Sequence, residues 1–359
     1  MHGADRIPVR RNSFEKGGNM FAKKPHAWVG AGCLVAALLA SPAVSVGAEV
    51  IKFGIFTPPK TNIMVKGIVP FLDEVSRQSK GTFQYKGFWG GSIMRNPERQ
   101  YEVLLSGLQD GAMVLPSYTE ALFPDFTLFT LPNLFLSAEE ASVAMWRMHQ
   151  QRLLGGLDKM YVMAIYSNGN GAFHVSKKLD SVQGLAGLKI RAAGPGESDV
   201  IKAMGAVPVG MAITQVAEAV NRGVVDGTLS GWDATRSFRI EPLIVTSIDM
   251  PFGTRSFLLV LNRQVYDRLA QEAKDALAKY GGEPLSRKFG KIFDDADKAM
   301  VEAAMKNPKK VVINADKAAL AALEKKFKPF HDAWIRENRD GQKKYDALRR
   351  ILAELRKGS

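Results

Sequence analysis

From residue 50 onward, short apolar segments alternate with longer amphipathic ones, and this alternation constrains the fold more than any other feature of the chain. Short runs rich in Val, Ile, Phe and Tyr are typical of strands, and the amphipathic segments between them are typical of helices. The regular exchange of the two predicts an α/β fold with a largely parallel sheet. The expected strands cover residues 50–56, 82–88, 111–115, 161–166, 187–191, 207–209, 224–227 and 257–262.

The expected helices have recognisable ends. Asn96 followed by Pro97 is typical of a helix start, and Gly205 stands where a C-cap glycine is expected. Gly281 and Gly282 interrupt a long polar helix. We expect helices over residues 65–78, 96–107, 197–204, 266–307 and 316–357.

The alternating pattern occurs in two sets, the second beginning at Tyr161, with no internal repeat and no low-complexity linker between them. Two α/β lobes without a flexible linker indicate that the chain crosses between them more than once. Ligands of such proteins bind at strand ends, in the cleft where the lobes meet.

The first 48 residues are typical of a secretory signal peptide and not of the fold. A basic start at Met20, an apolar run over residues 27–40 and a small-residue site ending at Ala48 form its three parts. The sequence leaves open whether translation starts at Met1 or at Met20. The only cysteine, Cys33, lies within the apolar run. The exported chain therefore has no disulfide and depends on its hydrophobic core.

The charge of the chain is positive, but its distribution does not indicate nucleic acid. Residues 1–48 carry six Lys/Arg and two Asp/Glu, which leaves about +9 of the formal +13 for the exported part. Much of this excess lies in the last fifty residues, on expected helical faces. No stripe of arginine and aromatic residues is present, and export argues against a nucleic-acid partner.

Arg191 is the best candidate for a binding residue. It ends an apolar strand and is followed by the turn Ala-Ala-Gly-Pro-Gly. A guanidinium at a strand end can donate two parallel hydrogen bonds to a carboxylate. The alternative is a surface arginine paired with Glu197 or Asp199.

The sequence offers little for catalysis or for a cofactor. The histidines beyond the signal region, His149, His174 and His331, are far apart, and no His or Cys cluster with metal-ligand spacing occurs. Neither a Gly-x-Ser-x-Gly elbow nor a dinucleotide-binding glycine motif is present. His174 is the best single candidate for a base. We expect no enzyme, no transition-metal site built from His or Cys, and no cofactor.

The region around Arg191 resembles the solute-binding proteins of tripartite ATP-independent periplasmic (TRAP) transporters, the DctP-type receptors. The similarity is strongest in residues 180–191, in Met-Gly-Ala-Val-Pro-Val-Gly-Met (204–211) and in Ala-Val-Asn-Arg-Gly-Val-Val-Asp-Gly (219–227). It is weaker at residues 51–54, 91–111 and 258–262.

This resemblance implies a two-lobed periplasmic binding protein fold with a cleft between the lobes, a long shared helix and a helical C-terminal tail. Lobe I then comprises residues 49–168 and 257–300, lobe II comprises residues 169–256, and residues 301–359 form a helical segment that packs across both.

The resemblance also implies a function. A receptor in the periplasm binds a small organic acid anion, closes on it and delivers it to the small and large TRAP membrane subunits. A receptor for a sensory or chemotaxis partner and a periplasmic enzyme are the alternatives. The sequence leaves open whether a metal ion joins the ligand and whether the C-terminal helices form a homodimer.

Arg191 matches the family's main carboxylate-binding arginine, but two other polar positions depart from the family pattern. Phe173 stands where many members have a second arginine, and Ser230 stands where many have an asparagine. These departures imply a ligand less anionic than a dicarboxylate, or one that is oriented differently. Asn168 or Asn170 then supplies substitute hydrogen bonds; the alternative is that both are turn residues that suit the backbone conformation.

Aromatic residues beside glycines in expected loops often line clefts. Packing in the core or between lobes is the alternative for each of them. Together they predict an apolar wall opposite Arg191, formed by Trp89, Tyr118, Trp232 and Phe252.

Overall fold

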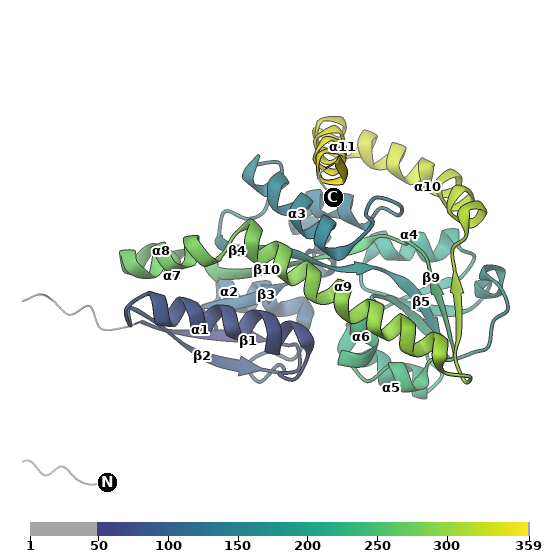
Figure 1. Cartoon of the computed structure of the whole chain (residues 1–359), viewed down its shortest axis with the longest axis horizontal. Helices are drawn as coiled ribbons and strands as arrows, with labels where there is room; N and C mark the ends of the chain where they lie inside the picture. The colour runs from purple at the N-terminus through teal and green to yellow at the C-terminus, as the bar shows by residue number, and fades with distance from the viewer. Residues whose placement is uncertain (1–48, 358–359) are drawn as a thin grey trace, which may run out of the picture. The chain divides into compact units, whose positions relative to one another are not determined.

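The computed structural model describes residues 49–357, and the expected signal peptide with Cys33 lies outside this range. The strands form two sheets of mixed direction, with helices packed against both (Figure 1). The first sheet has the strand order β2-β1-β3-β10-β4, and the second has the order β11-β9-β5-β8-β6-β7.

In the first sheet, β1 (Glu49–Ile55) pairs in parallel with β2 (Phe83–Trp89) and β3 (Gly111–Val114). The returning strand β10 (Thr254–Asn262) runs antiparallel to β3 and to β4 (Met160–Asn170). Every residue of β3 is buried. This agrees with a central strand that is covered on both faces.

In the second sheet, β6 (Lys189–Ala192) lies in parallel between β7 (Val207–Gly210) and β8 (Gly227–Ser230). Two further strands extend it: β5 (Ala172–Val175) is antiparallel to β8 and to β9 (Thr246–Asp249). The edge strand β11 (Val311–Asn314) pairs in parallel with β9.

The sheets are therefore less parallel than predicted, because β10 and β5 each return against their neighbours. Strands β5, β9 and β11 were not predicted, and β8 begins three residues later than expected. The presence of β11 also means that residues 301–359 are not helical throughout. Within residues 49–357 the chain passes between the sheets from β4 to β5, from β9 to β10 and from β10 to β11.

Two helical layers cover the first sheet. Side chains of α1 (Val69–Gln78), α8 (Gln271–Tyr280) and α9 (Glu283–Lys306) form one core with β1 and β10. The opposite core contains α3 (Ala138–Gln150) and α11 (Gly341–Lys357). Helices α4 (Pro195–Ala203) and α10 (Lys317–Glu337) contribute to the core of the second sheet.

The remaining helical elements are short. A π-helical turn at Ile63–Ile68 precedes α1, and short 3-10 turns at Pro116–Tyr118, Glu120–Leu122 and Ile213–Gln215 lie near the pocket described below. The other α-helices are α2 (Gln100–Leu105), α5 (Val216–Asn221), α6 (Trp232–Ser237) and α7 (Arg263–Arg268).

Helix α9 connects the two sheets, as the long green helix in Figure 1 shows. It contacts β4 of the first sheet and β11 of the second. Its Asp294 carboxylate accepts hydrogen bonds from the N–H groups of Ala138 (2.7 Å) and Glu139 (2.9 Å), at the start of α3. Its Asp297 accepts one from the N–H of Asp233 (2.9 Å), at the start of α6. Carboxylates at helix N-termini satisfy unpaired N–H groups, so α9 fixes helices on both sides.

Several predicted helix ends are confirmed. The Asn96 side chain accepts a hydrogen bond from the N–H of Glu98 (2.9 Å), and Gly205 has φ +82° just after α4. The long helix predicted over residues 266–307 is interrupted at Gly281 and Gly282, and again before α8. Gly282 has φ +79°, which an L-residue adopts only with strain.

Candidate ligand-binding pocket

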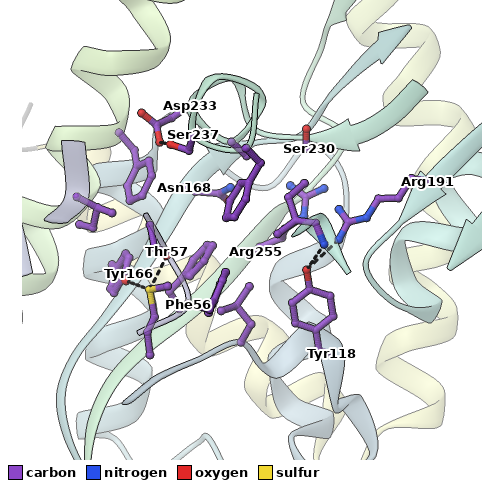
Figure 2. Close-up of a pocket in the computed structure, with 18 residues that line it drawn as sticks. Phe56, Thr57, Tyr118, Tyr166, Asn168, Arg191, Ser230, Asp233, Ser237 and Arg255 are labelled. Carbon is purple, nitrogen blue, oxygen red and sulfur yellow. Dashed lines mark hydrogen bonds between the residues drawn. The ribbon is translucent and has the colours of Figure 1, made fainter. Parts of the chain in front are cut away.

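A pocket lies where residues of both sheets meet, and its empty space, including the part open to solvent, measures about 560 Å³. Figure 2 shows the eighteen side chains that line it. They are Phe56, Thr57, Ile63, Met113, Leu115, Tyr118, Tyr166, Asn168, Arg191, Ile213, Ser230, Asp233, Ala234, Ser237, Phe238, Arg255, Phe257 and Phe293.

Arg191 enters the pocket from the end of β6 and is only 1% exposed. Its Nε donates to the carbonyl of Met211 (2.8 Å), and its Nη2 donates to Oη of Tyr118 (2.9 Å). The Gly194–Pro195 turn ends the strand and begins α4, so β6 stops where its arginine reaches the pocket. No carboxylate of the described residues forms an ion pair with this guanidinium, although Glu197 and Asp199 were the expected alternatives.

Tyr118 is the side-chain hydrogen-bond partner of Arg191. Its Oη accepts from Arg191 and also from the N–H of Ile213 (3.1 Å). Figure 2 shows the phenol pointing toward the guanidinium. Among residues 49–357, no acceptor for the phenol O–H is found, so this proton is available to a ligand.

A second arginine also reaches the pocket, and the sequence analysis missed it. Arg255 of β10 is 5% exposed and forms an ion pair with Glu197 of α4. Its Nη2 donates to the carbonyl of Leu229 (2.8 Å), whereas its Nη1 has no partner among the described residues. The expected strand began at residue 257, which assigned Arg255 to a loop. The sequence did contain a signal for Arg255, because this arginine stands just before an apolar strand.

Two uncharged polar groups lie beside the arginines. The Oδ1 atom of Asn168 and the Oγ atom of Ser230 are buried without a hydrogen-bond partner in the described part of the chain. Buried polar atoms are nearly always paired, so unpaired ones in a pocket indicate where a ligand or water binds. Arg191, Arg255, Tyr118, Asn168 and Ser230 are called the polar end below.

The rest of the pocket is mainly apolar, and five of its residues are aromatic. The rings of Tyr166, Phe257 and Phe293 lie nearly parallel, with centroids 5.3–6.3 Å apart. Phe56 and Phe238 form a second stacked pair at 6.2 Å. These five residues are called the aromatic end.

Of the four aromatic residues predicted for an apolar wall, only Tyr118 is among the residues that line this pocket. Of the eight predicted site residues, Arg191, Tyr118 and Ser230 line the pocket. Trp89 lies at the end of β2 and packs near Tyr85, with centroids 6.3 Å apart. Trp232 donates through Nε1 to Asp249 (3.1 Å).

Phe173 and Phe252 pack against each other in the core of the second sheet, with centroids 4.7 Å apart. In β5, Phe173 lies opposite Leu229 of β8 and Ile248 of β9, both of which belong to the same core. Successive side chains of a strand face opposite sides of a sheet. Ser230 therefore faces the pocket, whereas Phe173 faces the core.

Of the two asparagines considered, Asn168 lines the pocket and Asn170 does not. The Nδ2 atom of Asn170 donates instead to the carbonyl of Phe135 (3.0 Å). His174, the candidate base, is buried and its Nδ1 contacts Oγ of Ser247 (2.9 Å). Burial lowers the pKa of His174 to about 3, so its ring is neutral at physiological pH.

The carboxyl group of Glu120 lies at the start of the helix that carries Glu197. Glu120 accepts a hydrogen bond from the N–H of Gly196 (3.4 Å) at the start of α4. Burial, together with the charges of Glu197 and Asp199, raises the pKa of Glu120 to about 7, and the hydrogen bond from Gly196 partly opposes this rise. This carboxyl therefore titrates near neutrality.

Asp233 of α6 is the only other charged residue among the eighteen that line the pocket. Its Oδ1 accepts from Nδ2 of Asn62 (3.0 Å), and its Oδ2 accepts from Oγ of Ser237 (2.9 Å). Figure 2 shows Asp233 on the far side of the pocket from Arg191.

In residues 49–357, no group of three or more His, Cys, Asp or Glu side chains is arranged to hold a metal ion. The helices in this range are also too short or too polar to span a membrane. The site consists of two guanidinium groups, the carboxylate of Asp233, a few neutral hydrogen-bonding groups, and aliphatic and aromatic side chains.

These features agree with the comparison to known proteins. Residues 53–338 match the family model of bacterial extracellular solute-binding protein family 7, the DctP family. The protein belongs to this family. Its members and structural neighbours are binding proteins of TRAP transporters and not enzymes, as the sequence predicted.

Two relatives illustrate the similarity. The C4-dicarboxylate-binding periplasmic protein DctP of Rhodobacter capsulatus is 25% identical over 309 residues, covering 84% of this chain and 92% of the relative. A solute-binding protein of Albidiferax ferrireducens is 24% identical over 221 residues, covering 59% of this chain and 64% of the relative. The chain thus spans somewhat less than two thirds of the second relative.

Two solved structures share the fold. A TRAP solute-binding protein from Rhodoferax ferrireducens in complex with copurified benzoate has a TM-score of 0.80 and 24% identity, covering 86% of this chain and 99% of that one. A marine metagenome TRAP solute-binding protein specific for aromatic acid ligands, in complex with metahydroxyphenylacetate, has a TM-score of 0.79 and 24% identity, covering 85% and 99%. The fold is therefore the two-lobed TRAP receptor fold that the sequence predicted.

Proposed function

We propose that the protein is a periplasmic receptor that binds a small organic carboxylate through Arg191, closes on it and delivers it to a TRAP-type permease of small and large membrane subunits. The observation that carries this proposal is the buried guanidinium of Arg191, which lines the pocket and has no carboxylate partner among the described residues. A buried cation without a counter-ion is costly, and an acid's carboxylate removes that cost.

The carboxylate binds at the polar end. Arg191 already donates through Nε to Met211, so its orientation is fixed before the ligand arrives. The phenol O–H of Tyr118 and the free Nη1 of Arg255 are further donors at this end. Several fixed donors around one anion give charge-assisted hydrogen bonds without a large ordering cost.

The body of the ligand lies at the aromatic end. Nearly parallel rings of Tyr166, Phe257 and Phe293 offer faces and edges that pack well against a flat ring. An aromatic monocarboxylic acid is therefore the ligand class that we favour. The benzoate found with the Rhodoferax ferrireducens protein supports this choice by analogy.

Closure brings the two lobes together around this ligand. We assign residues 49–168 and 257–300 to one lobe and residues 169–256 to the other, with residues 301–359 packing across them. The hydrogen bond between Tyr118 and Arg191 then crosses from one lobe to the other. A ligand that adds contacts on both sides shifts the population toward the closed form.

Calorimetry with aromatic, hydroxy, keto and dicarboxylic acids tests the binding step. We expect at least one aromatic acid to bind, and we expect X-ray scattering to show a smaller radius of gyration when it does. If no acid in such a panel binds, or if the scattering profile is unchanged at saturation, the proposed receptor mechanism is wrong.

Uptake tests the delivery step. Cells that express the receptor together with a TRAP small and large subunit should accumulate the bound acid, and cells without the receptor should not. Recovery of unchanged ligand by mass spectrometry after incubation separates a receptor from an enzyme. Normal uptake without the receptor would leave the protein with a sensory role.

A further inference from the structure

We propose that Glu197 restricts this site to acids with a single negative charge, because it neutralises the second arginine of the pocket. This inference rests on the proposed function and names the class of acid more narrowly. It also replaces the sequence-based explanation, in which the second cation was absent because Phe173 stands in its place. The cation is present as Arg255, and a carboxylate of the protein already occupies it.

The pair of Glu197 and Arg255 is buried on both sides, since each side chain is only 6% exposed. Glu197 is fixed by a second contact, in which its other oxygen accepts from the N–H of Ala193 (2.9 Å). Arg255 is fixed as well, because its Nη2 donates a hydrogen bond to the carbonyl of Leu229. A ligand carboxylate cannot displace Glu197 without leaving a buried charge unpaired.

The far side of the pocket is also unsuitable for a second anion. Asp233 lies there, and its carboxylate already accepts hydrogen bonds from Asn62 and Ser237. Like charges in a partly desolvated site repel strongly because the local dielectric is low. A second carboxylate at this position would face Asp233 without a cation to compensate it.

The charges of the pocket therefore leave one place for an anion. Arg191, Arg255 and Asp233 are the charged residues among the eighteen in its lining, and Glu197 cancels Arg255. One uncompensated cation, Arg191, remains at the polar end. The ligand of this site is therefore a monocarboxylate. The second carboxylate of a dicarboxylate would be repelled by Glu197 at the polar end or by Asp233 on the far side.

A pair of ligands that differ in one charge and hardly in shape tests this inference. Isophthalate carries two carboxylates on the same side of its ring, so that both can face the polar end, and its monoamide, 3-carbamoylbenzoate, replaces one of them by a neutral amide. Benzoate serves as the reference acid. We expect wild-type protein to bind 3-carbamoylbenzoate roughly tenfold or more tightly than isophthalate in calorimetry at neutral pH.

Glu197→Gln should reduce this preference several-fold, because Arg255 then has no counter-ion and becomes available to the second carboxylate. Asp199→Asn is the matched control: it removes the same charge from the same helix, but its side chain is 58% exposed and pairs with Lys202. We expect the control to keep the wild-type ratio. A general effect of charge would instead change both variants alike.

The double variant Glu197→Gln with Arg255→Gln covers the case in which the single variant does not fold. It removes both members of the pair and leaves the local charge balanced, so it should keep the preference for the monoamide. Thermal unfolding verifies that each variant is folded before its affinities are compared.

Three results would overturn the inference while the proposed function stands: equal binding of the two ligands to wild type, an unchanged ratio in folded Glu197→Gln, and binding of benzoate without either larger ligand. The last result would show that size and not charge limits the site. Absence of benzoate binding together with absence of binding of every other acid would instead remove the proposed function itself.

Discussion

The polar end and the aromatic end of the pocket are built in different ways. At the polar end, each charged group has a defined partner, as in the contacts of Arg191 with Met211 and Tyr118 and of Arg255 with Glu197. At the aromatic end, the rings of Tyr166, Phe257 and Phe293 pack against one another and against core neighbours such as Phe289. Directional contacts fix orientation, whereas ring packing tolerates changes in shape.

This difference suggests a division of roles between the two ends. The polar end determines that an acid binds and how its carboxylate is oriented. The aromatic end determines which body the acid carries. Substitutions at the polar end should therefore weaken every acid, whereas substitutions at the aromatic end should distinguish among acids.

The largest effect is expected for Arg191→Ala. Removal of this guanidinium leaves the ligand's carboxylate buried without its main partner, which should weaken binding of benzoate by about 2–5 kcal/mol in calorimetry. The control is Arg222→Ala, since Arg222 is exposed and pairs with Glu218 on the surface. Near-native affinity of the Arg191 variant would show that the polar end is not where the acid binds.

Arg191→Lys separates charge from geometry. A lysine keeps the positive charge but cannot donate to Met211, Tyr118 and a carboxylate at the same time, because an ammonium has no planar fork. We expect an affinity well below that of wild type, though above that of the alanine variant. Full affinity in the lysine variant would reduce the role of the polar end to charge alone.

These expectations involve residues that the sequence revealed to different degrees. Arg191 could be predicted because a strand-end arginine followed by Gly and Pro is a local signal. Arg255 could not be predicted from the strand pattern, because the expected strand was too short by three residues at its start. Pairing with β4 extends β10 to Thr254, and that long-range contact is not visible in the local sequence.

The aromatic end could not be predicted for a related reason. Tyr166 and Phe257 lie inside strands, and Phe293 lies inside a helix, where an aromatic residue normally belongs to the core. The predicted wall used aromatics beside glycines, and Trp89, Trp232 and Phe252 instead pack elsewhere. Which face of a strand meets a cleft depends on register, as the opposite orientations of Phe173 and Ser230 show.

Tyr118→Phe should have a smaller effect than the loss of Arg191. The variant keeps the ring but leaves Nη2 of Arg191 and the N–H of Ile213 without their acceptor. We expect a loss of about 1.5 kcal/mol in binding of any acid, typical for a hydrogen bond to a charged group. The control is Tyr85→Phe, whose hydroxyl donates to Asp73 outside the pocket (2.6 Å). Equal affinities of both variants would mean that the phenol does not position Arg191.

Phe257→Leu tests the aromatic end directly. Leucine keeps an apolar surface but removes a ring from the stack with Tyr166 and Phe293. Benzoate should bind about 1 kcal/mol more weakly, and cyclohexanecarboxylate should be affected less, because a saturated ring gains nothing from aromatic geometry. Phe252→Leu is the control, since that ring lies in the core of the second sheet. Equal losses for both ligands would contradict the proposed division between the two ends.

The smallest expected effect is a pH dependence of folding stability, which is caused by Glu120 near the polar end. Because the pKa of Glu120 is raised to about 7 in the folded protein, the folded state binds this proton more tightly than the unfolded state does. The stability that it contributes is fully present below the ordinary pKa of a glutamate and is lost as pH rises toward 7. Solvent screens this half-buried carboxyl, so we expect the difference to stay below about 1 kcal/mol.

Thermal unfolding of wild type and Glu120→Gln between pH 4.5 and 8 measures this difference. Subtraction of the two profiles removes the contributions of other groups whose pKa is raised, such as Asp249 and Asp294, because these are present in both proteins. The difference should change through neutrality and level off above it. A flat difference for Glu120→Gln would mean that solvent reaches this carboxyl and that its pKa is not raised in the folded protein.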